Sequence, residues 1–367
     1  MSHEKYMQRC LELAQNGMRA AMPNPSVGAV LVHKGKIIGE GHTSPFGGPH
    51  GEVNCINSVK QEHRHLIPDS TLYVSLEPCS HYGKTPPCCD LILQHQIKNI
   101  VVGTLDPHEK VSGNGIKKLQ QAGKTVTVGV LEKQCRESNQ RFFTFHEKKR
   151  SYIILKWAES ADGFLSPDSR YSNNSVSVLL ENNITEKKPI WITNSYSRQL
   201  VHKWRSEEHA ILVGTQTVID DNPQLDVRSW TGPNPVRIIL DQFNRIDSSY
   251  FVKNLKIKTI VLTAQSNLTN LDNLTYETIA FDENLPNAIA GVLYKHNLLS
   301  VIIEGGRQTL QTFIDAGLWD EARIFKGETI FNNGTKAPEI TGALIDRHSI
   351  QQDKLLIYKN YGEHDNI

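Results

Sequence analysis

The twelve residues EPCSHYGKTPPC, at positions 77–88, organise the first half of the chain. They follow Thr71–Leu76, an apolar run with the length and composition of a short buried strand. Pro86-Pro87 directly precede the last of the twelve, Cys88. Because proline suits the first turn of a helix, the pattern predicts a helix that begins at these prolines and continues through Gln96. This order of strand, loop and helix is repeated on both sides of the block and favours a layered α/β domain.

Outward from this block, turn residues and hydrophobic periodicity predict the neighbouring elements. Met7, Cys10, Leu11 and Ala14 share one helical face, which Gly17 ends. The predicted elements are helices at 3–17, 53–60 and 115–122, and strands at 27–33, 36–41, 100–103 and 126–130.

A charged cluster at Glu147–Arg150 separates this region from a second α/β region. We therefore predict two domains, residues 1–147 and 148–367. The second has predicted strands at 152–157, 209–214, 236–241, 259–264, 300–304 and 354–359, and a helix at 307–316. Most of the polar stretch 166–189 is predicted to be a long loop.

Three residues around the opening block have side chains that suit a zinc ion. His50 offers an imidazole, and Cys79 and Cys88 offer thiolates. Three protein ligands leave a fourth position for water, which is typical of a catalytic zinc. Glu52 is placed to take a proton from that water and pass it to a leaving amine. The arrangement of His-x-Glu with Pro-Cys is typical of zinc deaminases that act on nucleobases.

The spacing of the cysteines leaves alternatives open. Eight residues separate Cys79 from Cys88, whereas the usual signature has two. We prefer Cys88 because it directly follows the two prolines, at a helix start that favours a thiolate, but Cys89 is a rival ligand. The alternative without a catalytic role is a structural zinc site. Cys10, Cys55 and Cys135 are predicted to be small core residues.

Composition bounds the class of protein. The 367 residues suffice for two domains, and 38% apolar with 22% charged residues is a globular composition. A net charge of +1 and 7% aromatic residues do not favour a nucleic-acid partner. The start of the chain has no apolar run typical of a signal peptide, and no stretch nears membrane-spanning length. We therefore expect a cytoplasmic protein whose cysteines serve chemistry rather than disulfides.

The block at 77–88 closely resembles a known family, as do Pro23–Gly28 and the Gly-x-Gly-His run that ends at His42. The family is the bifunctional diaminohydroxyphosphoribosylaminopyrimidine deaminase and 5-amino-6-(5-phosphoribosylamino)uracil reductase of riboflavin biosynthesis. The resemblance covers nearly the whole chain. It implies a cytidine-deaminase-like three-layer N-terminal domain and a dihydrofolate-reductase-like C-terminal domain. It also implies zinc and NADPH as cofactors.

In the first half, the resemblance implies hydrolysis of the 2-amino group of a pyrimidinone ribotide. Glu52 is then catalytic, and four matched residues contact the substrate: Asn24, His42, His81 and Lys84. Asp106 and the Gly113–Gly115 turn also fit the family pattern. This chain departs from it at Gly51, where alanine is usual, and in the segment 43–49, which is one residue longer.

In the second half, the residues alone indicate little. No Gly-x-Gly-x-x-Gly follows a strand, and Glu304-Gly305-Gly306 is a weak phosphate-binding signal at a helix start. The resemblance implies hydride transfer from NADPH to carbon 1 of the opened ribose. It places Lys156 and Asp162 in catalysis. It places Arg205, Leu225, Arg228 and Glu304 at the substrate, with both arginines on its phosphate, and Lys156, Trp191, Thr193, Thr217, Asp221, Gly305 and Gly306 at the cofactor.

The same resemblance suggests a homo-oligomer, a dimer or tetramer, formed through the reductase domains. The partner is then a small pyrimidine ribotide, with neither nucleic acid nor membrane. The segment 164–190 is longer than usual, and we interpret it as a flap or an oligomer contact. Two alternatives are a deaminase with an inactive reductase half, and a deaminase or binding protein that acts on nucleic acid.

Overall fold

The computed structural model describes residues 3–83, 85–108, 112–168 and 191–361. The chain divides into two compact units, Met1–Arg150 and Ser151–Ile367. Among the described residues, no helix is both long enough and apolar enough to cross a membrane. The fold is mixed α/β in both units, as the sequence predicts.

The first unit is built on a sheet of five strands within the described residues, in the order β2-β1-β3-β4-β5. β1 pairs antiparallel with β2 and with β3, whereas β3, β4 and β5 are parallel. Parallel neighbours need crossover connections, so helices follow β3 and β4. The strands are β1 (Gly28–His33), β2 (Lys36–His42), β3 (Thr71–Leu76), β4 (Asn99–Thr104) and β5 (Thr125–Val128).

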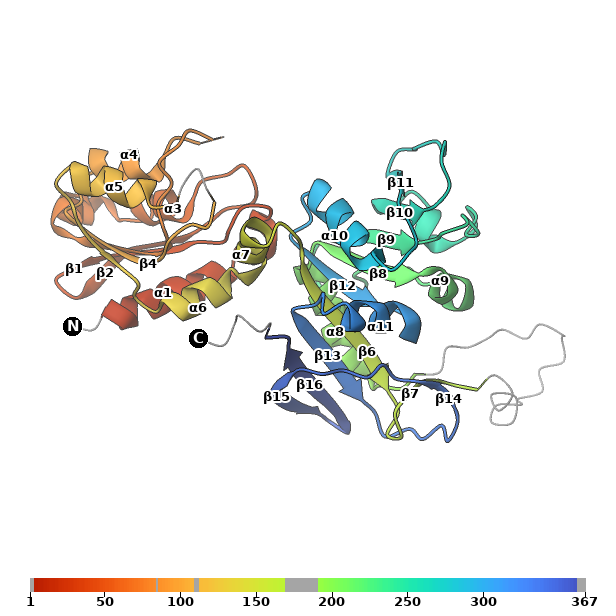
Figure 1. Cartoon of the computed structure of the whole chain (residues 1–367). Coiled ribbons are helices and arrows are strands. Elements are labelled where there is room, and N and C mark those ends of the chain that lie inside the picture. Colours follow the sequence, from red (N-terminus) through yellow and green to blue (C-terminus); the bar gives the residue numbers. More distant parts are fainter. Residues whose placement is uncertain (1–2, 84, 109–111, 169–190, 362–367) are drawn as a thin grey trace. The chain divides into compact units, whose positions relative to one another are not determined.

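Helices cover both faces of this sheet and make three layers (Figure 1). α1 and α6 lie on one face, where Met7 and Cys10 pack against β1 and β3, and Cys135 joins the same core. α3, α4 and α5 lie on the other face. Cys10, Cys55 and Cys135 are fully buried, as predicted. The helical segments are α1 (His3–Gln15), α2 (Met18–Ala21), α3 (Gly51–Asn57), η1 (Gln61–Asp69), α4 (Cys88–Gln94), α5 (Asn114–Gln121), α6 (Glu132–Ser138) and α7 (Gln140–Glu147).

The second unit has a sheet of nine strands, within the described residues, in the order β11-β10-β9-β8-β12-β6-β13-β16-β15. Neighbours from β11 to β13 are parallel, and β16 and β15 continue antiparallel. A small separate sheet pairs β7 with β14. The strands are β6 (Tyr152–Glu159), β7 (Phe164–Pro167), β8 (Ala210–Gly214), β9 (Val236–Leu240), β10 (Thr259–Thr263), β11 (Leu274–Thr278), β12 (Ser300–Glu304), β13 (Glu321–Lys326), β14 (Gly334–Lys336), β15 (Ala343–Ile350) and β16 (Asp353–Lys359).

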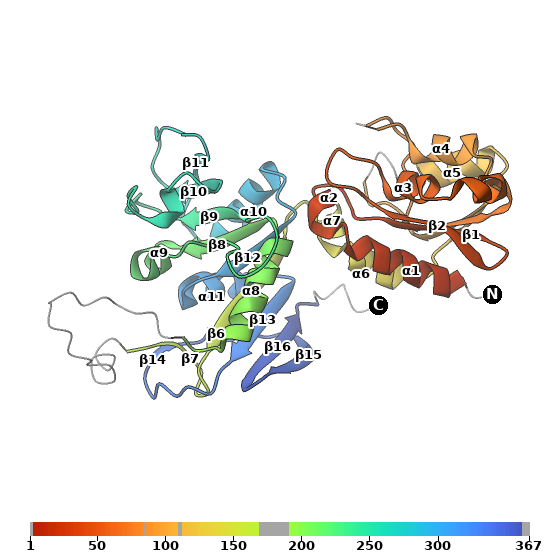
Figure 2. The same cartoon turned by 180° about the vertical axis from the view of Figure 1, so that it is seen from behind.

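Alternate residues of the central strands feed cores on the two faces of this sheet. α10 and α11 cover one face, where Leu155 and Ile303 are buried. α8 covers part of the other face, where Ile154 and Ile302 pack beneath it (Figure 2). Near-continuous apolar runs are what strands buried on both faces require. The helices are α8 (Ser195–Glu207), α9 (Thr215–Asp221), η3 (Phe251–Lys253), α10 (Leu285–Lys295) and α11 (Arg307–Asp315).

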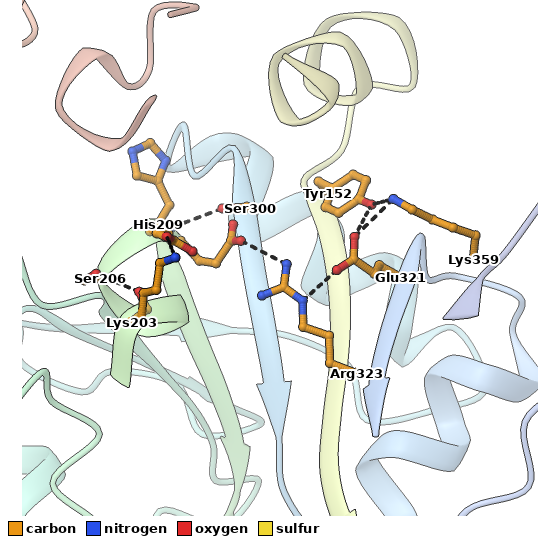
Figure 3. Close-up of polar contacts among 10 residues, drawn as sticks. Tyr152, Lys203, Ser206, His209, Ser300, Glu321, Arg323 and Lys359 are labelled. Atoms are coloured by element: carbon orange, nitrogen blue, oxygen red, sulfur yellow. Dashed lines mark hydrogen bonds and ion pairs between the residues drawn. The ribbon is translucent and has the colours of Figure 1, made fainter. Parts of the chain in front are cut away.

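A polar cluster joins the amino-terminal ends of the parallel strands in this unit (Figure 3). The Glu321 carboxylate accepts hydrogen bonds from the Tyr152 hydroxyl at 2.9 Å, from Lys359 Nζ at 3.1 Å and from Arg323 Nε at 2.6 Å. Arg323 also faces the buried Glu208 carboxylate at 3.6 Å. Ligand sites of open α/β sheets lie at the carboxyl ends of the strands. This cluster lies at the opposite end, where it ties β6, β13 and β16 together.

The predicted strands of the first half agree with the structure within a few residues at each end. The prediction that Pro86-Pro87 lie inside the helix is wrong, because α4 begins at Cys88 and Pro87 is its N-cap. The elements for which the sequence analysis gave no range are α2, η1, α6, α7, α8, α9, η3 and α10 among the helices, and β7, β11, β13, β14 and β15 among the strands. β15 is exposed along almost its whole length, so it lacks the apolar alternation by which strands are predicted.

Candidate active sites

The structure brings the three predicted zinc ligands together from three separate elements. His50 is the N-cap of α3, Cys79 follows the end of β3, and Cys88 is the first residue of α4. His50 Nδ1 lies 3.6 Å from Cys79 Sγ and 3.3 Å from Cys88 Sγ. One donor atom from each residue lies within 4.8 Å of the other two. They form the one such cluster of His, Cys, Asp or Glu side chains found across the described residues.

Cys89, the rival ligand, points away from this cluster. Its thiol contacts the carbonyl oxygens of Pro78 at 3.3 Å and Gly115 at 3.6 Å. Burial raises the pKa of this thiol to about 12. Cys79, by contrast, has a lowered pKa because it accepts hydrogen bonds from the Cys88 thiol and from His50. The geometry therefore favours Cys88 as the second cysteine of the site.

Glu52 lies in the first turn of α3, two residues after His50, and is 3% exposed. Burial, and then the neighbouring Cys79 thiolate, raise the pKa of its carboxyl group to about 7. A carboxyl group with such a pKa exchanges protons readily near neutral pH. Its position fits the predicted role in proton transfer.

Asn54 holds the loop that precedes His50, a role that was not predicted. Its side-chain amide donates to the His42 carbonyl oxygen at 2.7 Å and to Ser44 Oγ at 2.9 Å. Gly51 lies close to β1, since a Cβ there would stand 2.4 Å from the Val27 carbonyl oxygen. These contacts fix the entry of the chain into α3 and hence the position of His50.

The described residues among those predicted to contact the substrate in this half lie in loops and at a strand end. Asn24 follows α2, and His42 ends β2 beside Gly51. His81 is exposed in the loop between the cysteines, and its ring stacks on that of His108 at 6.4 Å between centroids. His108, in the loop after β4, was not predicted. Lys84 lies outside the described residues.

In the second unit, several predicted residues meet at the carboxyl ends of β6, β8 and β12. Gly306, the N-cap of α11, donates its backbone N–H to Thr217 Oγ1 at 3.2 Å. A Cβ on Gly305 would lie 3.6 Å from the backbone nitrogen of Gly214. The ends of β8 and β12 therefore approach closely, as expected for a ligand site in a parallel sheet.

Lys156, Arg205 and Glu304 form a largely buried charge cluster at this edge. The guanidinium of Arg205 donates two hydrogen bonds to the Glu304 carboxylate, from Nε at 3.1 Å and from Nη2 at 2.9 Å. Lys156 Nζ lies 3.4 Å from the same carboxylate. Burial opposes ionisation of Glu304, but the two cations outweigh it and lower its pKa to about 2. Burial lowers the pKa of Lys156. Arg205, expected at the phosphate, is thus engaged by Glu304.

Other predicted residues of this half have different partners. The Asp162 carboxylate accepts from Ser160 Oγ and from the backbone N–H groups of Phe331 and Asn332, and it has no described contact with Lys156. The Leu225 side chain is a core residue, 3% exposed, so only its backbone, in the left-handed region at φ 50°, is available to a substrate.

The remaining predicted residues lie nearer the surface. Arg228 is exposed and pairs with Asp226 at 2.6 Å. Trp191 is exposed and carries the guanidinium of Arg198 over its ring at 4.6 Å. Thr193 accepts from Arg198 through its carbonyl oxygen, and Asp221 ends α9. Most of the proposed flap, residues 169–190, lies outside the described residues.

Comparison with known proteins assigns both halves. A family model described as the cytidine and deoxycytidylate deaminase zinc-binding region matches residues 1–104, and one described as the RibD C-terminal domain matches residues 151–331. The riboflavin biosynthesis protein RibD of Aquifex aeolicus is 36% identical over 98% of each chain. RibD of Escherichia coli is 31% identical over 89% of this chain and 87% of its own.

A solved structure resembles the chain over nearly its full length. It is the diaminohydroxyphosphoribosylaminopyrimidine deaminase/5-amino-6-(5-phosphoribosylamino)uracil reductase of Thermotoga maritima, with 33% identity and a TM-score of 0.84. The match covers 97% of this chain and 98% of that one. The chain therefore belongs to the RibD family of bifunctional riboflavin-biosynthesis enzymes, with a deaminase half followed by a reductase half.

Proposed function

We propose that the first half removes the 2-amino group of 2,5-diamino-6-(ribosylamino)-4(3H)-pyrimidinone 5'-phosphate by hydrolysis. The second half then reduces the ribosyl group to a ribityl group with NADPH. The observation that carries this proposal is the His50, Cys79 and Cys88 triad beside a buried Glu52, in a chain with both family domains. An inactive reductase half is disfavoured because Lys156 and Glu304 are in contact.

The spacing of the triad fits a zinc ion. Zinc bonds of about 2.0 Å to nitrogen and about 2.3 Å to sulfur, at tetrahedral angles, put these donor atoms about 3.6 Å apart. The distances from His50 Nδ1 to the two sulfurs are 3.6 and 3.3 Å. We therefore infer that His50, Cys79 and Cys88 hold zinc and leave a fourth position open.

When bound, zinc polarises a water molecule for attack on the ring carbon that bears the amine. Glu52 accepts the proton of that water and delivers it to the departing amine, which leaves as ammonia. A pKa of about 7 allows the same carboxyl group to do both. Asn24, His42 and His81 are proposed to orient the ribotide. Lys84 is proposed to hold its phosphate through charge.

NADPH is proposed to bind at the carboxyl ends of β6, β8 and β12. The start of α11 at Gly305-Gly306 offers backbone without side chains, which suits the close approach of a phosphate. Thr217 and Lys156 lie at the same edge. Glu304, ionised between Lys156 and Arg205, is proposed to orient the opened ribose for hydride transfer to carbon 1. Arg228 is then the more accessible arginine for the substrate phosphate.

One experiment separates the two activities. The purified protein is given the diaminopyrimidinone ribotide with and without NADPH, and ammonia release and NADPH oxidation are followed. Ammonia should appear without NADPH, and NADPH should be oxidised only once deaminated product is present. NADPH oxidation that ignores the deaminated product would contradict the reductase assignment, and absence of ammonia release would contradict the deaminase assignment.

Three predictions concern the oligomeric state, the location and the partners of the protein rather than its chemistry. A homo-oligomer formed through the reductase halves, a cytoplasmic location and the absence of a nucleic-acid partner remain predictions of the sequence and the family. A salt-dependent shift of RNA in a binding assay would favour the nucleic-acid alternative.

A further inference from the structure

Glu77, the first residue of the opening block, has a buried side chain with an unusual set of partners. It directly follows β3 and stands two residues before Cys79. Its Oε2 accepts the backbone N–H groups of Asp106 at 3.2 Å and Gly113 at 2.9 Å. Its Oε1 accepts those of Gly115 at 2.9 Å and Ile116 at 3.3 Å. Four backbone donors, two from the connection between β4 and α5 and two from the first turn of α5, thus converge on one carboxylate.

Only an ionised carboxylate matches this set of donors. Each of its two oxygens accepts two N–H groups, and neither needs to donate. The amide of a glutamine has one oxygen, so its NH₂ group would face two backbone donors. Two of the four N–H groups, those of Gly115 and Ile116, belong to the first turn of α5. N–H groups in a first helical turn have no hydrogen-bond acceptor inside their own helix. Negative charge is favourable at that position. Glu77 therefore caps α5 from a strand that is distant in sequence.

The same contact presses α5 against the backbone that leads into Cys79. A Cβ on Gly115 would lie 2.1 Å from the Pro78 carbonyl oxygen and 3.1 Å from Glu77 Oε1. The backbone N–H of Cys89 donates to the Cys79 carbonyl oxygen at 3.1 Å, and that of Cys88 approaches Cys79 Sγ at 3.3 Å. Cys79 is therefore fixed between the start of α4 and the start of α5.

The connection held by Glu77 also carries groups that face the loop between the two cysteines. Asp106, whose N–H binds Glu77, accepts the His108 N–H at 2.7 Å. The His108 ring stacks on that of His81, which belongs to the loop between Cys79 and Cys88. One carboxylate thus links the segment that carries Cys79 to the loop between the two cysteines.

We propose that Glu77 is a positioning residue for the deaminase half, an inference that rests on the deamination proposed above. It places Cys79 relative to His50 and Cys88, and it places the segment of Asp106 and His108 against the loop that carries His81. Glu77 makes no contact with the reacting atoms. Its loss should therefore alter metal retention and turnover together while leaving the second half of the protein intact.

The test compares Glu77→Gln with Glu77→Asp in the full-length protein. Glu40→Gln is the matched control, since the Glu40 carboxylate also accepts two hydrogen bonds, but from Arg9 on α1 and not from the segments that hold Cys79. We expect Glu77→Gln to lower zinc retention against a chelator, and the kcat of ammonia release, by about 10- to 100-fold, the usual effect of removing a supporting partner of a metal site. Glu40→Gln should match the parent.

Spectroscopy separates positioning from folding. Loaded with cobalt(II), Glu77→Asp should keep the metal but shift the visible bands that report thiolate coordination, with reduced kcat. Reduction of supplied deaminated intermediate should equal the parental rate in every variant. A folded, metal-loaded Glu77→Asp or Glu77→Gln protein with parental spectrum, kcat and KM would overturn the proposal. Failure of the parent itself to release ammonia would refute the deamination, while metal retention and the cobalt spectrum would still decide the role of Glu77.

Discussion

The substitution Glu304→Gln tests the charge cluster at the carboxyl end of β12. In the parent, one carboxylate faces two cations, with contacts of 2.9 Å to Arg205 and 3.4 Å to Lys156. Glutamine keeps the shape of the side chain and removes its charge. Lys156 and Arg205 then face each other without this counter-ion, in a place where their side chains are 15% and 12% exposed.

The size of the effect follows from the pKa of Glu304. Although burial raises this pKa, Arg205 and Lys156 lower it from 4.5 to about 2. At about 1.4 kcal/mol per pKa unit, the surroundings favour the ionised carboxylate by about 3 kcal/mol. Little of this is screened by solvent, because the Glu304 side chain is 13% exposed. We expect Glu304→Gln to lower the free energy of unfolding of the second unit by about 3 kcal/mol, which is typical of a broken buried ion pair.

The pH dependence has a definite sign. A carboxyl group whose pKa is lowered on folding stabilises the protein above its unfolded pKa, and this contribution is lost as pH falls through the folded pKa. For Glu304 the loss runs from about pH 4.5 down to about pH 2. The difference between parent and Glu304→Gln should therefore be constant around neutral pH and shrink below about pH 4.5.

Urea unfolding followed by tryptophan fluorescence measures this difference. All five tryptophans lie between residues 157 and 319, so the signal reports the second unit alone. Glu277→Gln is the control, because Glu277 also contacts two basic side chains, Lys295 and His296, but Lys295 is 65% exposed, and exposed pairs contribute less than about 1 kcal/mol. A free energy of unfolding for Glu304→Gln within about 0.5 kcal/mol of the parent would refute the reasoning. A difference that persists unchanged in acid would refute the assigned pKa.

Four further substitutions test the deaminase half. Glu52→Ala should keep zinc and the reductase step but slow ammonia release by about 10²- to 10⁴-fold, and parental ammonia release would remove Glu52 from proton transfer. Metal analysis should show zinc lost from Cys88→Ser and kept in Cys89→Ser; the opposite pattern would make Cys89 the ligand. Gly115→Ala places a Cβ 2.1 Å from the Pro78 carbonyl oxygen, so a chelator should remove zinc faster, and parental retention would show that this contact is unimportant.

Sequence patterns were sufficient for the zinc donors because their chemistry is local. His50, Glu52 and Cys79 are recognised by residue type and neighbours, and burial of the central strands follows from their apolar runs. The choice between Cys88 and Cys89 was open because both stand at the start of one helix. It depends on which way each thiol points once α4 packs against the sheet, and there the Cys89 thiol faces the Pro78 and Gly115 carbonyl oxygens.

In the second half, too, residue types indicated which side chains belong to the site, whereas only the fold shows which of them pair. The family pattern placed Lys156, Arg205 and Glu304 in one site, but their pairing depends on the register of β6 with β12 and on α8. The fold also decides that the Asp162 carboxylate accepts the backbone N–H of Asn332, which follows β13, and that the Leu225 side chain is buried.

The residue types alone indicate the chemistry: an imidazole and thiolates suited to zinc, a carboxyl group nearby, and two α/β domains of one enzyme family. Which of these groups meet depends on the tertiary structure. Glu77 is the clearest case, since its four backbone partners lie 29 to 39 residues away along the chain. Backbone N–H groups carry no signal in the sequence, because every residue except proline has one. Their convergence on a single carboxylate becomes visible only when β3, β4 and α5 are packed together.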